Sequence, residues 1–159
     1  MLFRSLGLVL GVLLGGGARA GRDKVVLDCD PAFAAWLEQL VAESTGKHGV
    51  GVLPVPGSAV DAVGPDRLRV SYGRGGDLDL ASDAGGDLHG DATVLGSELV
   101  RWEVATAMCG ALLHINPFDQ PDVEAAKRAA GRVLEGGVAD IPVIDLDDAL
   151  AEVGPGAYV

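Results

Sequence analysis

A strand that runs directly into a helix, near the N-terminal end, constrains the fold more than any other feature of this sequence. Residues 24–29, Lys-Val-Val-Leu-Asp-Cys, are β-branched and apolar enough to predict a buried strand. Asp30 and Pro31 follow as an N-cap and a first helical residue, and Gly46 is a suitable end for the helix. The apolar stripe of this helix consists of Phe33, Trp36, Leu37, Leu40 and Val41. A strand joined so closely to an amphipathic helix predicts an α/β layer architecture.

The middle of the chain continues this alternation. After a glycine-spaced loop to Pro56, residues 67–72 alternate polar and apolar side chains, as in a strand with one solvated face. The Gly- and Asp-rich segment 73–96 lacks periodicity and predicts a flexible surface loop. Ser97 is expected to cap a helix that continues to Ile115. The pattern predicts a doubly wound α/β fold with a mainly parallel sheet.

A third helix is expected to begin at Pro121 and to end at Gly136. Beyond it, residues 142–146 should lead into a short acidic helix, and Tyr158 with Val159 resembles the start of another strand. Because the pattern stops there, we expect the domain to be incomplete. The third helix has apolar positions that predict an inward face, namely Val123, Ala126, Ala130, Val133 and Leu134.

Length and charge limit the classes of function. A chain of 159 residues suffices for one domain with a real core. The formal net charge of −11 argues against binding to nucleic acid or to an anionic membrane, so that an anionic ligand would need a local cluster of donors. No Cys/His pair has the spacing of metal ligands, and we expect no metal. Cys29 and Cys109 lie in apolar segments and are interpreted as buried thiols in a reducing compartment.

Residues 1–20 allow two interpretations. Arg4, the apolar run from Leu6 to Leu14 and the small residues at 18–20 satisfy the pattern of a secretory signal peptide. The same run also suits an apolar helix that leads into the first strand. It is too short and too rich in glycine to be a transmembrane span.

The segment 115–127, Ile-Asn-Pro-Phe-Asp-Gln-Pro-Asp-Val-Glu-Ala-Ala-Lys, carries most of the chemical information. Pro121 starts a helix whose first turn holds two acidic residues, so Gln120 lies at the mouth of that helix. Lys127 follows about two turns further along the same face. An amide and an ammonium group on one face are suited to a hydroxylated, anionic ligand.

A second polar pair stands at the end of the first predicted amphipathic helix. Gln39 and Glu43 are one turn apart in the string Glu-Gln-Leu-Val-Ala-Glu-Ser-Thr-Gly-Lys, residues 38–47. This string and the segment 115–127 resemble, in order and in internal spacing, two signatures of the glucose-6-phosphate isomerase family. The resemblance runs from about Gly21 to the C-terminus, but residues 57–96 carry none of it. It is closest to the form of the enzyme that is fused to a transaldolase, and it implies a doubly wound sugar-isomerase domain.

The resemblance implies a role for each of the four polar residues. Glu43 would be the base that moves a proton between neighbouring carbons, and we expect it to be partly buried beside apolar side chains. Gln39 and Gln120 would bind sugar hydroxyls, and Lys127 would assist ring opening and binding. The ordinary alternatives are a solvated carboxylate at a helix end, surface glutamines, and a lysine paired with Glu124.

Other parts of the family's site have no counterpart here. None of His48, His89 and His114 lies in a segment like the family's ring-opening histidine motif. His114 is expected to be a core or interface residue instead. The phosphate-binding loop belongs to a preceding N-terminal sugar-isomerase domain that we do not find. Residues 21–159 of this chain are therefore interpreted as a partial C-terminal sugar-isomerase domain, preceded by an apolar helix at residues 1–20. The whole enzyme would be a cytoplasmic isomerase of glycolysis and gluconeogenesis, whose phosphate-binding half this chain lacks. We expect the chain to be inactive alone, to need no cofactor, and to form a homodimer in the full enzyme.

One alternative comes from a different class of protein. Residues 75–79 and 85–89 resemble the Gly/Asp repeats of calcium-binding β-rolls. Together with a signal peptide they would describe a secreted calcium-binding module. Two copies are too few for such a repeat, and their spacing of ten residues does not match its period of nine. Calcium titration would separate this alternative from the isomerase.

Overall fold

The computed structural model describes residues 5–57, 64–73, 75–80, 91–136 and 145. The chain divides into two compact units, Met1–Pro121 and Asp122–Val159, which are described separately. The expected short acidic helix after residue 146 and the strand at 158–159 lie outside the described residues.

The first unit is built on a four-stranded sheet in which every pair of neighbours is parallel. Its strands are β1 (Lys24–Asp28), β2 (Leu53–Pro56), β3 (Arg67–Ser71) and β4 (Leu78–Asp79). In space they follow the order β2-β1-β3-β4, so the winding reverses after β2. Reversal beside the first strand is the topology of doubly wound α/β folds, as the sequence predicts.

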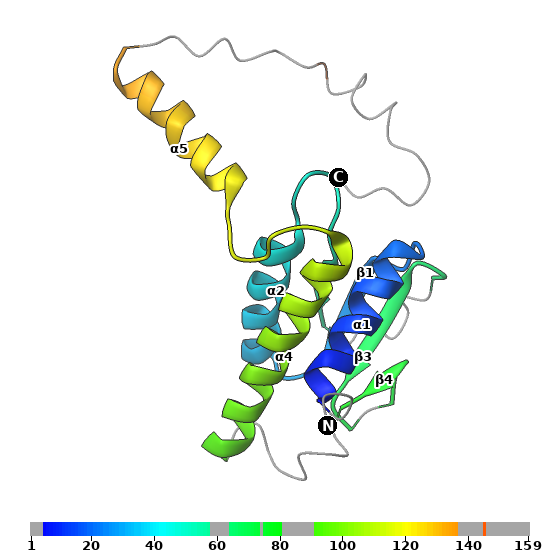
Figure 1. Cartoon of the computed structure of the whole chain (residues 1–159). Helices are drawn as coiled ribbons and strands as arrows, with labels where there is room; N and C mark the ends of the chain where they lie inside the picture. The colour runs from blue at the N-terminus through cyan, green and yellow to red at the C-terminus, as the bar shows by residue number, and fades with distance from the viewer. Residues whose placement is uncertain (1–4, 58–63, 74, 81–90, 137–144, 146–159) are drawn as a thin grey trace. The chain divides into compact units, whose positions relative to one another are not determined.

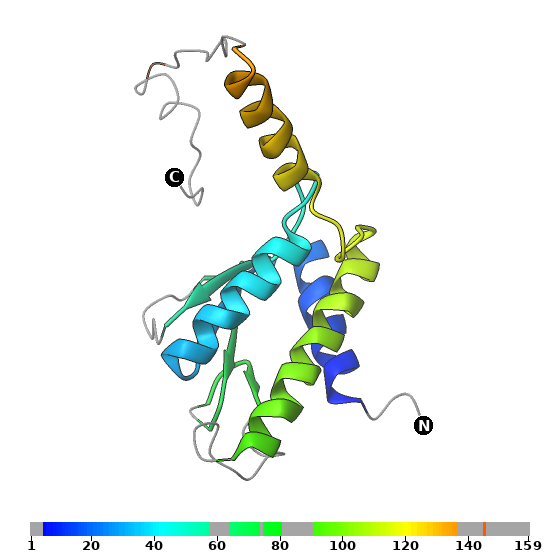
Figure 2. The ribbon, with the colours of Figure 1, turned by 90° about the vertical axis from the view of Figure 1, so that its left-hand side faces the viewer.

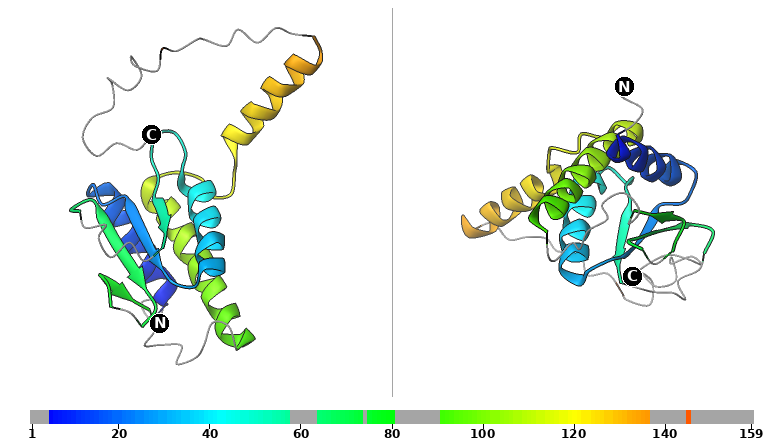
Figure 3. Two further views of the ribbon diagram at one scale, coloured as in Figure 1. Left: turned by 180° about the vertical axis from the view of Figure 1, so that it is seen from behind. Right: turned by 90° about the horizontal axis from the view of Figure 1, so that it is seen from below.

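Three helices of this unit lie on one side of the sheet (Figures 1 and 3). They are α1 (Leu6–Arg19), α2 (Pro31–Thr45) and α4 (Ala92–Leu113). Alternate residues of β1 and β3 meet them in one apolar core, because successive strand side chains point to opposite faces. The sheet contributes Val25, Leu27, Leu68 and Val70, and the helices contribute Leu10, Leu14, Phe33, Leu37, Val41, Trp102, Ala105 and Cys109.

The predicted helix after β1 is confirmed in detail. The carboxylate of Asp30 accepts hydrogen bonds from the backbone N–H groups of Ala32 and Phe33, at 2.9 and 3.1 Å. Pro31 is the first helical residue, and Gly46 is the C-cap. These caps satisfy backbone groups that a helix end would otherwise leave unpaired.

Three predicted loop and helix boundaries are wrong. The loop expected between Gly46 and Pro56 contains β2. The flexible loop expected at 73–96 contains β4 and the first turn of α4, while its residues 74 and 81–90 lie outside the described residues. The side chain that caps α4 is Asp91, which accepts a hydrogen bond from the Thr93 N–H at 2.8 Å. Ser97 is inside the helix and donates to the Val94 carbonyl.

Helices α1 and α4 lie side by side at close approach (Figure 2). Three glycines of α1, Gly7, Gly11 and Gly15, face α4, and a Cβ on Gly11 would lie 2.4 Å from the carbonyl oxygen of Ala105. Leu10 and Leu14 on the same helix are buried. Residues 6–19 thus supply part of the core, while the choice between a native helix and a signal peptide stays a prediction. No helix among the described residues is long and apolar enough to cross a membrane.

A partly buried polar network links Tyr72, the residue after β3, to α4. The Tyr72 hydroxyl donates to Glu98 Oε2 at 2.7 Å and accepts from Trp102 Nε1 at 2.9 Å. Arg101 lies 3.2 Å from the other oxygen of Glu98, whose side chain is fully buried. Burial raises the pKa of Tyr72 well above its usual value, so the phenol stays protonated and holds the carboxylate.

The two cysteines are reduced thiols of different accessibility, since Cys29 is half-buried and Cys109 is buried. Burial raises the pKa of Cys109 to about 11 from its ordinary value of 9.0. The thiolate is the reactive form, so we expect an aromatic disulfide reagent at pH 8 to modify Cys29 and spare Cys109 in the folded chain. A count of modified thiols before and after denaturation checks this. Rapid modification of both in the native protein would contradict the burial of Cys109.

Helix α5 (Pro121–Leu134) begins at the boundary of the two units. None of its residues is buried, and Val123, Val133 and Leu134 are exposed. Within the described part of the second unit nothing covers the apolar face of α5, and the predicted inward face stays a prediction. Periodicity shows that a helix is amphipathic, but not that a partner surface covers its apolar face.

Candidate functional site

The C-terminal end of α2 presents a carboxylate held by a neighbouring amide. Gln39 and Glu43 are one helical turn apart, and Gln39 Nε2 donates to Glu43 Oε1 at 3.1 Å. Both side chains are exposed. The expectation that Glu43 is partly buried is wrong in this chain, because the apolar stripe of α2 faces the sheet and α4 while Glu43 points away from it.

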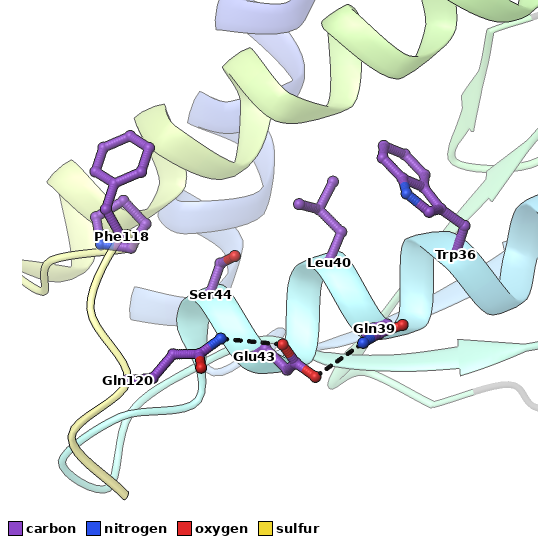
Figure 4. A pocket seen from close by; sticks show the side chains of 8 residues that line it. Trp36, Gln39, Leu40, Glu43, Ser44, Phe118 and Gln120 are labelled. Atoms are coloured by element: carbon purple, nitrogen blue, oxygen red, sulfur yellow. Dashed lines mark hydrogen bonds between the residues drawn. The ribbon is translucent and has the colours of Figure 1, made fainter. Parts of the chain in front are cut away.

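A turn after α4 brings a second amide to the same carboxylate. Gln120 Nε2 donates to Glu43 Oε2 at 3.1 Å, across 77 residues of sequence. Figure 4 shows the carboxylate of Glu43 between the two amides. Because each carboxylate oxygen has more than one acceptor position, both remain able to accept a further hydrogen bond.

The shape of this turn follows from its sequence. The Phe118 N–H donates to the side-chain oxygen of Asn116 at 3.1 Å, which closes an Asx turn. Pro117 packs on α4 at Gly110, where a Cβ would lie 3.0 Å from the proline ring. The chain leaves α4 through His114, which adopts a left-handed conformation with φ of 59°. His114 is exposed in this chain, so a place in the core is excluded, while the expectation that it lies at an interface stays a prediction.

A pocket of about 290 Å³ lies between α2 and this turn. Apolar and polar side chains both face it, as Figure 4 shows, and Phe118 at its rim is 84% exposed. A pocket with an apolar wall and a few convergent hydrogen-bonding groups is typical of sites for small polar molecules. It is lined by Trp36, Gln39, Leu40, Glu43, Ser44, Pro117, Phe118 and Gln120.

The fourth predicted site residue, Lys127, belongs to the second unit. Its Nζ atom lies 3.0 Å from Glu124 Oε1, three residues earlier on α5, and both side chains are largely exposed. This is the ordinary ion pair of an exposed helix face, which contributes little to stability. The ligand role of Lys127 stays a prediction.

The described residues give the calcium alternative no support. They contain no group of three or more His, Cys, Asp or Glu side chains placed to hold a metal ion. In the repeat at 75–79, Asp77 accepts from the Arg69 N–H, and Asp79 accepts from the N–H groups of Gly73 and Gly75. The other repeat at 85–89, with His89, lies outside the described residues.

The fold and this pocket together define an α/β protein with a parallel sheet and an amide-flanked carboxylate at the end of α2. In sequence the chain is similar to a protein of Halobacterium salinarum described as "Probable glucose-6-phosphate isomerase", with 28% identity over 152 residues. The alignment covers 65% of this chain and 36% of that protein. The chain thus matches about a third of the relative's length, and the match does not extend to a transaldolase. No known family profile and no solved structure matches the chain.

Proposed function

We propose that this chain is part of a glucose-6-phosphate isomerase, an aldose–ketose isomerase that interconverts glucose 6-phosphate and fructose 6-phosphate. The observation that carries the proposal is the meeting of Gln39 and Gln120 on Glu43. These residues come from two separate strings that resemble the family, and the fold brings them together around one carboxylate. The similarity to the Halobacterium protein points to the same class of reaction.

Glu43 would act as the base of this reaction. It would take the C2 proton of the open-chain aldose while the C2–H electrons form the enediol double bond and the C1 oxygen takes a proton from water. The protonated carboxyl would then return its proton to C1 while the C2 hydroxyl gives its own proton back to water, which yields the ketose. One carboxylate can serve both steps because the two carbons are adjacent.

The two glutamines would fix the base and bind the substrate. Each amide NH₂ already donates to Glu43, while an amide also carries a carbonyl oxygen that can accept from a sugar hydroxyl. The apolar wall formed by Trp36, Leu40 and Phe118 would exclude water from one side of the sugar. Lys127 would assist ring opening, and neither a metal nor a redox cofactor is needed for this proton transfer.

The phosphate group would be bound outside this chain. We infer a preceding sugar-isomerase domain that supplies the phosphate loop, and a second subunit that completes the site in a cytoplasmic homodimer. Fusion to a transaldolase and a place in glycolysis or gluconeogenesis are part of the same proposal. The chain alone would then hold the sugar weakly and would not turn it over.

Titration with fructose 6-phosphate tests the proposal. In amide-detected NMR spectra of the 159-residue chain, we expect millimolar sugar phosphate to shift the side-chain signals of Gln39, Gln120 and Trp36, since an isolated half-site binds weakly. Glycerol phosphate is the control for the phosphate alone and should leave those signals in place. Coupled assays should show no isomerisation by the chain. Spectra that fructose 6-phosphate leaves unchanged, or turnover by the chain alone, would contradict the proposal.

A further inference from the structure

A buried lysine joins the two strings that form the pocket. Lys47 follows the C-cap of α2, and its side chain is only 2% exposed. Its ammonium group donates to the carbonyl oxygen of Asn116 at 2.7 Å and to the carbonyl oxygen of Asp119, and it lies 3.1 Å from Asp119 Oδ1. All three acceptors belong to the turn that precedes Gln120.

A tight turn directs this lysine inward. Lys47 and Val50 exchange both backbone hydrogen bonds, at 2.9 and 3.0 Å. The two residues between them, His48 and Gly49, have φ values of 55° and 77°, as in a type I′ hairpin turn. The buried Thr45 anchors the start of the segment by accepting from the Val52 N–H at 3.0 Å. The backbone around Lys47 is therefore fixed on both sides.

The contacts of Lys47 hold the turn to the end of α2. A buried ammonium group is tolerated only when its donors are satisfied, and the acceptors here are two main-chain carbonyls and one carboxylate. Those carbonyls belong to residues 116 and 119, so both ends of the short segment that carries Phe118 are held. Gln120 comes directly after the second of them and reaches Glu43.

We propose that Lys47 is a positioning residue, which places Gln120 and the aromatic rim against Glu43 without touching the ligand itself. Its consequence for catalysis rests on the proposed function, whereas its effect on the geometry of the pocket does not. Without Lys47, the backbone of residues 116–119 would lose its attachment to α2. The Gln120 amide would then lose its hydrogen bond to the Glu43 carboxylate and would be hydrogen-bonded to water instead.

This inference is tested by NMR spectra of the complete 159-residue chain, recorded at a temperature where wild type and variants are folded. In Lys47→Met, we expect the Gln120 side-chain amide signals to move to the positions of a solvent-exposed glutamine. Hydrogen exchange of the Phe118 amide should quicken by about tenfold or more, because charge-assisted bonds to the turn are lost. Amides of the α4 core, such as Ala105, should keep their shifts. A merely stabilising lysine would lower the unfolding temperature but leave the Gln120 signals in place.

Two further variants make the test decisive. Lys127→Met removes an exposed lysine that also has an acidic partner, and it should leave the Gln120 signals unchanged. Asp119→Asn removes the ion pair but keeps the two carbonyl acceptors, so we expect a smaller shift of the same signals. Asp119→Asn decides the matter if Lys47→Met does not fold, and unchanged Gln120 signals in it would then overturn the inference. Fructose 6-phosphate could leave the spectra of the wild-type chain unchanged while Lys47→Met still shifts the Gln120 signals. In that case the proposed function fails and the positioning role stands.

Discussion

Replacement of Glu43 by glutamine should lower kcat by about a hundredfold or more in an active isomerase that contains this chain, with little change in KM. The variant keeps the size of the side chain but removes the basic oxygen. One of its ends becomes an NH₂ group that faces an amide donor from Gln39 or Gln120, so one of the two present hydrogen bonds is also lost. Glu43→Asp should act similarly, because withdrawal of the carboxylate by about 1 Å can cost about a hundredfold in rate. Steady-state kinetics in both directions measure these effects.

Glu38→Gln is the matched control for Glu43. Glu38 is also an exposed carboxylate on α2, but it does not line the pocket, and its replacement should leave kcat unchanged. Lys127→Ala should behave in a third way, raising KM and slowing use of the closed-ring sugar more than of the open-chain form. If Glu43→Gln kept near-normal kcat on both sugar phosphates, another group would carry the proton and the proposed role of this helix would be wrong.

The parts of the fold that local chemistry determines could be predicted from the sequence. The β-branched run of β1, the Asp30 cap and Pro31 each act within a few residues, and the structure confirms them. The elements missed were those whose strand character depends on distant neighbours. β2 contains Pro54 and Pro56 and lies at the edge of the sheet, where it pairs with β1 alone and tolerates proline. β4 has only two residues, embedded in a Gly- and Asp-rich segment.

The candidate site divides in the same way. The pairing of Gln39 with Glu43 follows from helical spacing, but spacing could not place Gln120 on the same carboxylate. Gln120 follows a turn in which Pro117 packs against Gly110 and two carbonyl oxygens accept hydrogen bonds from Lys47, and these contacts are distant in sequence. The sequence does carry a sign of the buried Lys47, because the lysine stands directly before a His-Gly pair that suits a tight turn. Burial of a lysine is uncommon enough that sequence reasoning favours the surface.

The second large expected effect is on the stability of the packed helices α1 and α4, and it is tested at two glycines of α1. A methyl group on Gly11 would lie 2.4 Å from the Ala105 carbonyl oxygen and 2.6 Å from Met108 Cβ, whereas a methyl group on Gly16 would meet nothing within 4 Å. Gly11→Ala should therefore force α1 away from α4 and lower the free energy of unfolding by about 1–3 kcal/mol. Gly16→Ala should raise it by about 0.5–1 kcal/mol, because alanine is the better helix former.

Urea unfolding of the two variants, followed by the tryptophan fluorescence of the buried Trp102 and the partly buried Trp36 together, measures the difference. The substitutions have the same chemistry and lie on the same helix, so helix propensity cancels between them and the clash with α4 remains. Loss of α1 from its place would uncover Leu10 and Leu14, which are 1% and 2% exposed in the folded chain, and would open the core beside Cys109. Gly11→Ala should therefore also expose Cys109 to the thiol reagent that spares it in the wild type. Equal stabilities for the two alanine variants would mean that α1 does not pack on α4 in solution.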